Sequence, residues 1–89
     1  MKAVITVVGK DTVGILAKVS TKCAEYNVNI AEVSQTILNG MFCMIMIGDV
    51  EGLNCSFGDF ADNLSKYGEE MNLKISVMHE DIFNSMHKI

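Results

Sequence analysis

The chain has 89 residues, of which 49% are hydrophobic, and it carries a formal net charge of −4 at pH 7. This length has room for one hydrophobic core, so we expect a single domain over residues 1–89. All seven cationic side chains are lysine, and the absence of arginine, the preferred residue for bidentate phosphate contacts and guanine recognition, argues with the acidic balance against a direct nucleic-acid ligand.

The apolar content bears on location and assembly. The longest apolar run, Met41 to Ile47, is far shorter than the roughly 20 residues of a membrane span. The scattered cysteines Cys23, Cys43 and Cys55 lie in apolar contexts, which indicates reduced, buried thiols in a cytoplasmic protein with no membrane partner. A small domain buries only part of its apolar surface, so the surplus predicts a homodimer or a higher homo-oligomer.

The first strand and helix are predicted from their apolar patterns. Lys2 to Val8 is apolar on both faces, as in a central strand. Asp11 or Thr12 is expected to cap the following helix. The apolar positions that follow recur at helical spacing, and Asn27 is expected to end the helix; these positions are Leu16, Val19, Cys23 and Tyr26, with Ile15 widening the stripe.

A hairpin comes next. Ile30 to Leu38 is a half-polar strand, and Met41 to Ile47 returns after Asn39-Gly40, a pair that is typical of a type I′ turn. One face of the returning strand carries Phe42, Met44 and Met46, and the other carries Cys43, Ile45 and Ile47. Either set can line the sheet face that the helices leave bare.

The rest of the chain predicts a helix, a strand and a tail. Ser56-x-x-Asp59 is typical of a capping box that opens the second helix. Leu73, Ile75 and Val77 alternate with polar residues as in a strand. Asp81 to Ile89 places Ile82, Phe83 and Met86 on one side of a short helix that needs a docking surface to be stable.

The predicted order is β-α-β-β-α-β with a C-terminal helix. This is the α+β, ferredoxin-like split arrangement. Right-handed crossovers place both main helices on one face of a four-stranded antiparallel sheet, with the first and third strands in the middle.

The loop between the first strand and the first helix is the strongest candidate for a binding site. A helix start leaves unpaired N–H groups with a partial positive charge behind them. Gly14 lets a backbone come close to a ligand, or lets the helix pack closely on a strand. Backbone N–H groups from Val13 to Leu16 suit a carboxylate, whereas Asp11 suits an ammonium group.

Lys10-Asp11-x-x-Gly14-Ile15-Leu16, followed by a helix and Asn29-Ile30, resembles the ACT domain family over essentially the whole chain. The resemblance implies a regulatory amino-acid sensor that pairs side by side, often into one eight-stranded sheet. It implies a ligand at the subunit interface, with Asp11, Val13, Gly14, Ile15 and Leu16 on one side and Asn29 with Ile30 on the other.

The chain departs from some serine-binding members of that family, which use an imidazole five residues before the glycine, where Gly9 stands here, and an amide three residues before it. Asp11 stands there and would repel a carboxylate beside it. A different amino acid, a reversed pose or no ligand therefore remain open. The competing hypothesis is a protein–protein module that regulates a separately encoded partner enzyme without binding a ligand.

Enzymes and metal carriers of the same strand order need residues that are missing here. A metal carrier needs Cys-x-x-Cys in the first loop, and an acylphosphatase needs an arginine there; neither is present. No nucleophile–base pair is apparent. His79 and His87 lie eight residues apart without cysteine spacing beside them. We therefore expect no catalytic residues, no metal and no cofactor.

Overall fold

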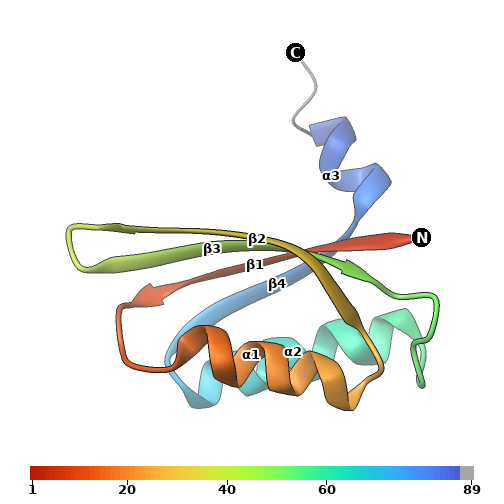
Figure 1. The fold of residues 1–89 in the computed structure, drawn as a ribbon, viewed down its shortest axis with the longest axis horizontal. Coiled ribbons are helices and arrows are strands. Elements are labelled where there is room, and N and C mark those ends of the chain that lie inside the picture. Colours follow the sequence, from red (N-terminus) through yellow and green to blue (C-terminus); the bar gives the residue numbers. More distant parts are fainter. Residues whose placement is uncertain (87–89) are drawn as a thin grey trace.

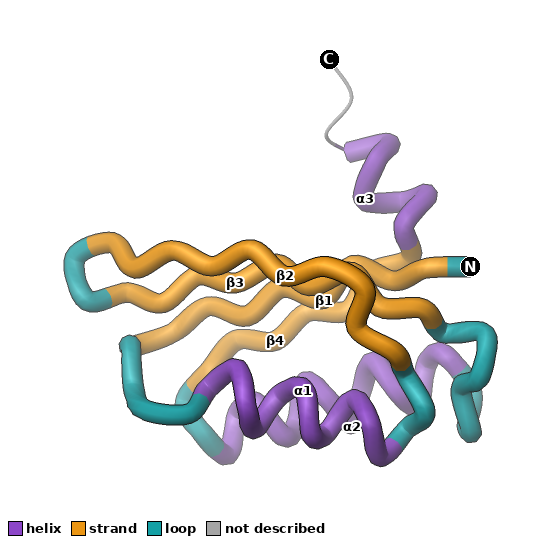
Figure 2. The backbone as a smooth tube through the Cα atoms, viewed as in Figure 1, coloured by secondary structure: helices purple, strands orange, loops and turns teal. Residues whose placement is uncertain are grey.

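The computed structural model describes residues 1–86, and it confirms the ferredoxin-like fold (Figures 1 and 2). One antiparallel sheet, in the order β2-β3-β1-β4, contains β1 (Lys2–Lys10), β2 (Asn29–Leu38), β3 (Met41–Asp49) and β4 (Leu73–His79). Helices α1 (Ile15–Glu25) and α2 (Phe57–Glu70) cover one face, and α3 (Glu80–Met86) rises from the opposite one.

Local sequence signals set three of the chain reversals. Asn39 (φ 52°) and Gly40 (φ 76°) are both left-handed, as a type I′ turn between β2 and β3 requires. Asn27 (φ 65°) ends α1 in the same conformation. Ser56 caps α2, because its hydroxyl accepts a hydrogen bond of 3.1 Å from the Asp59 N–H. The predicted turn, helix end and cap residue are confirmed, whereas within the described residues the Asp59 side chain returns no hydrogen bond to Ser56, so the predicted capping box is only half formed.

The core lies between the sheet and the two helices. Ile5 of β1 and Phe60 of α2 are fully buried there. Of the two candidate faces of β3, the one with Phe42, Met44 and Met46 points into this core. We call the opposite side of the sheet the outer face; it carries Val4, Thr6, Val8, Met41, Cys43, Ile45, Ile47, Lys10 and Lys74.

The start of α1 differs from the prediction. Neither Asp11 nor Thr12 caps the helix; the N-cap is Gly14, and no side chain in residues 1–86 caps this end. The chain makes a turn after Asp11, so the first helical residue is Ile15. This shift turns Ile15 into the core and leaves Leu16, the first residue of the predicted apolar stripe, 37% exposed.

The C-terminal helix was predicted over Asp81 to Ile89, and the structure describes it as far as Met86. His87 and the two residues after it lie outside the described residues. Over the described range, none of the helices is both long and apolar enough to span a membrane.

Candidate ligand-binding site

The β1–α1 loop is tied to the tip of the β2–β3 hairpin. The Asp11 N–H donates a hydrogen bond of 2.9 Å to the carbonyl oxygen of Gly40. At the other end of the loop, the Lys18 N–H donates to the Gly14 carbonyl at 2.9 Å and makes the first helical bond. The N–H groups of the first turn of α1 precede that bond and so have no intrahelical acceptor.

Gly14 is required by backbone conformation. It adopts φ 84° and ψ 15°, a left-handed region that costs an L-residue about 1–2 kcal/mol. A Cβ placed there meets only the side chain of Lys18, at 3.9 Å. Close packing of the helix on a strand, one of the two readings of this glycine, is therefore not the reason for it.

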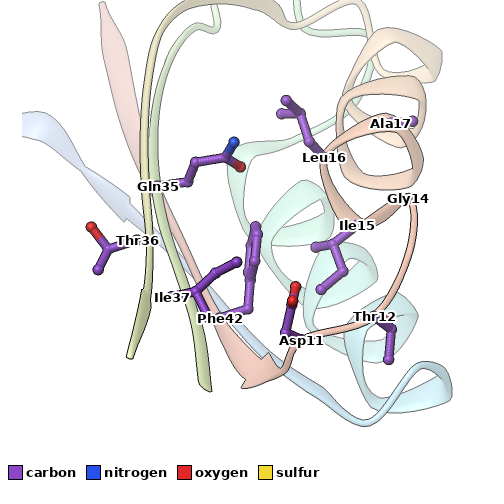
Figure 3. A pocket seen from close by; sticks show the side chains of 10 residues that line it. All are labelled: Asp11, Thr12, Gly14, Ile15, Leu16, Ala17, Gln35, Thr36, Ile37 and Phe42. Carbon is purple, nitrogen blue, oxygen red and sulfur yellow. The ribbon is translucent and has the colours of Figure 1, made fainter. Parts of the chain in front are cut away.

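A pocket of about 430 Å³ opens between this loop, the start of α1 and the end of β2. It is lined by Asp11, Thr12, Gly14, Ile15, Leu16, Ala17, Gln35, Thr36, Ile37 and Phe42. Figure 3 shows the side chains of Asp11 and Gln35 pointing toward the space between α1 and β2, and the Thr36 side chain pointing away from it. Thr36 therefore contributes its backbone, and not its side chain, to the lining of the pocket.

The pocket combines an apolar floor with two polar groups. Ile15 and Phe42 are buried and form the floor. The carboxylate of Asp11 makes no ion pair with any residue that the structure describes. The amide of Gln35, which both donates and accepts hydrogen bonds, lines the same space. Such a pocket suits a small molecule that carries an ammonium group and an apolar body.

Four of the seven predicted site residues line this pocket: Asp11, Gly14, Ile15 and Leu16. Val13 belongs to the same loop, but its side chain is 95% exposed and lies outside the lining. Asn29 and Ile30 begin β2, opposite Asp49 and Gly48 of β3. They lie beyond the far end of α1, whose 11 residues span about 16 Å. One protomer does not bring the two halves of the predicted site together.

The sequence analysis missed Gln35, Ile37 and Phe42 as site residues. A signal for them exists in the Asn39-Gly40 turn. That turn fixes a register in which Ile37 lies opposite Phe42 and Gln35 opposite Met44. Residues that lie opposite each other share a face of the sheet, so all three belong to the helix side, next to the loop.

The three cysteines lie outside the pocket lining; they were predicted to be buried, but only Cys23 is, and Cys43 and Cys55 are half-buried. Burial raises the pKa of the Cys23 thiol to about 11, so it is a packing residue with little thiolate character. His79 Nδ1 lies 3.8 Å from the carboxylate of Asp81. Within residues 1–86, no group of three or more His, Cys, Asp or Glu side chains gathers in a way that could hold a metal ion.

The family model for the ACT domain matches residues 2–78. The chain belongs to the ACT domain family. It is 49% identical, over the full length of both chains, to a UPF0237 protein of Listeria innocua.

Solved structures agree with this assignment. An ACT domain protein from Streptococcus pneumoniae superposes with a TM-score of 0.83 at 39% identity and 98% coverage of both chains. A formyltetrahydrofolate deformylase from Pseudomonas syringae matches with a TM-score of 0.78 at 27% identity, over 88% of this chain and 27% of the deformylase. ACT domains are generally regulatory and bind small molecules, so this chain belongs to a regulatory class of domain.

Proposed function

We propose that this ACT domain, spanning residues 1–89, is a cytoplasmic homodimeric sensor that binds an amino acid at two symmetric interface sites and has no catalytic role. The observation that carries the proposal is the position of the pocket. It opens along β2, an edge strand of the sheet. An edge strand presents unpaired backbone N–H and C=O groups to a second chain.

Apolar side chains line the same edge. Ile37 of β2 is 58% exposed and Leu16 of α1 is 37% exposed, and both line the pocket. Val33, which lies four residues before Ile37 on the same face of β2, is also exposed. Pairing with β2 of a second copy covers all three and extends the sheet to eight strands.

Two-fold pairing also completes the site. β2 runs from Asn29 to Leu38, and two identical antiparallel strands in full register place the first residue of one beside the last residue of the other. Asn29 and Ile30 of the partner subunit then lie next to Ile37, at the mouth of the pocket. This explains how residues at opposite ends of α1 serve one ligand.

The pocket's chemistry supports one orientation of the ligand. The ammonium group lies on Asp11, and the apolar side chain lies on Ile15 and Phe42. The carboxylate then points away from Asp11, toward the first-turn N–H groups of α1 or Asn29 of the partner subunit. Ligand affinity for one of two dimer forms gives the regulatory output.

Calorimetric titration with each of the twenty amino acids tests the proposal. We expect saturable heat for at least one apolar amino acid. Asp11→Asn removes the charge that holds the ammonium group but keeps an oxygen acceptor, and this loss of charge assistance costs about 1–1.5 kcal/mol, or roughly 5- to 10-fold in affinity. Asp62→Asn, an equally charge-removing change on the exposed face of α2, is the control and leaves binding unchanged. A folded dimer that gives no binding heat with any of the twenty amino acids contradicts the proposal.

The absence of binding heat with all twenty amino acids favours the second candidate, a module that regulates a separately encoded enzyme without a ligand. The Pseudomonas deformylase supports it, because the matched region is about a quarter of that longer chain. Retention of one defined enzyme by the wild-type protein, and its loss with an Ile37→Lys variant, supports this candidate.

A further inference from the structure

The outer face of the sheet is only half covered. At one end, Phe83 of α3 lines a cavity of about 400 Å³ together with Val4 and Met78 of the sheet. Val4 is buried at this end. At the other end, Val8 and Met41 are exposed, and Ile45 is exposed between the two ends. Contiguous apolar surface of this kind marks an interaction site.

Helix α3, which covers one end of the outer face, leaves large apolar side chains of its own exposed. α3 has seven residues and packs on β1 and β4. Ile82 is 55% exposed and Met86 is 65% exposed, although both are large and apolar. A helix this short gains its stability from tertiary packing. Two of the three apolar side chains of α3 do not pack against the sheet of the same protomer.

Charge distinguishes the two ends. Lys10 lies opposite Met41, and Lys74 lies opposite Val8, so both lysines border the uncovered apolar end. Both are exposed and make no ion pair with another residue in the range 1–86. The first turn of α3 carries Glu80 and Asp81. The uncovered end is therefore apolar and basic, whereas α3 is apolar and acidic.

We propose that the outer face binds a second copy of this chain with its strands reversed, so that α3 of each copy lies on the uncovered end of the other. A two-fold axis parallel to the sheet and across the strands brings these opposite ends together. Stacked sheets lie about 10 Å apart. The seven residues of α3, which rises from this face in Figure 1, span about 10 Å and reach across such a gap.

This interface is separate from the β2 edge. The β2 contact uses backbone groups and the helix-side residues Leu16, Val33 and Ile37, none of which lies on the outer face, so one molecule can use both surfaces at once. A chain that uses both forms a tetramer, in which two β2-paired dimers stack through their outer faces. The ligand pockets, on the helix side, stay open in that assembly.

Sedimentation equilibrium of the full chain tests the proposal. Ile82→Asp and Met86→Asp are made separately. Each places a carboxylate against the uncovered apolar end of the partner's outer face, and does so twice in a two-fold symmetric contact. We expect each to raise the dissociation constant at least about 100-fold and to halve the mass at micromolar concentration. Thr21→Asp, on the exposed side of α1, is the control and leaves the mass unchanged. An unchanged mass in both α3 variants overturns the proposal, and so does a lower melting temperature as their only effect.

Reversing the charges on both sides of the contact tests whether α3 lies on the uncovered, basic end of the partner's outer face. Lys74→Glu is expected to weaken the contact several-fold at low salt, and adding Asp81→Lys in the same chain restores it to within about twofold, because both charges of the contact are then reversed. Further weakening in the double variant overturns the reversed arrangement. Ile37→Lys probes the β2 edge in parallel. If this variant alone takes the wild-type assembly to monomers, the outer face makes no contact and the proposal is wrong.

Discussion

Replacing Gly14 by alanine isolates the role of the left-handed turn that opens the pocket. The residue has φ 84° and ample room, since an added Cβ meets only Lys18 Cε at 3.9 Å. The cost is therefore conformational and not steric. Left-handed backbone costs an L-residue about 1–2 kcal/mol, and the lower entropy of the unfolded chain returns up to about 1 kcal/mol. We expect a net loss of about 1 kcal/mol in the free energy of unfolding.

Urea denaturation at fixed protein concentration measures this change, because the stability of an oligomer depends on concentration. With a slope near 1–2 kcal/mol/M, the midpoint falls by roughly 0.5–1 M. Gly14→Asn is expected to cost less, because asparagine tolerates the left-handed region. Gly58→Ala is the matched control: Gly58 lies in α2 at negative φ with open space around it, and its replacement stabilises by about 0.5 kcal/mol. Equal effects of alanine at both positions would refute the conformational reading.

Three further changes test the packing of the fold. Gly68→Ala places a Cβ 2.6 Å from Ile75 Cγ1 and 2.9 Å from the Leu73 carbonyl oxygen, so we expect a loss of about 1–3 kcal/mol in urea denaturation. Ser56→Ala removes the α2 cap and should cost about 1 kcal/mol by the same assay. The Cys23 thiol, with its pKa raised to about 11, should resist alkylation at pH 8 in the native protein. Its neutral form is the one that the fold accommodates, so its contribution to stability is complete below pH 9 and is lost as the pH rises through 11, which urea midpoints for wild type and Cys23→Ala should show.

The fold was predictable where local chemistry and periodicity agree. Asn39-Gly40 specifies a two-residue hairpin by its backbone preference alone, and the two apolar faces of β1 place it in the middle of the sheet. Periodicity could not choose between the two faces of β3, because both are apolar. That choice depends on where the helices pack, which is a tertiary property.

The site was predictable only in part. Polar residues at positions 11 and 12 resemble helix caps, but the cap is Gly14, because the chain turns once more before the helix begins. The pocket wall from Gln35 and Ile37 depends on hairpin register and on how far β2 extends beside the loop. The predicted role of Asn29 depends on a second subunit, which one chain's sequence pattern does not position.

A subunit-mixing experiment tests most directly whether the ligand site is shared between two protomers. Asp11→Ala and Asn29→Ala subunits are prepared separately, mixed, allowed to exchange, and titrated with the amino acid that binds the wild type. Each variant alone should lose binding. Mixed dimers contain one intact site, with Asp11 from one subunit and Asn29 from the other. Random exchange therefore restores about a quarter of the wild-type sites at wild-type affinity. No recovery on mixing, with exchange confirmed, would contradict a site shared across the interface.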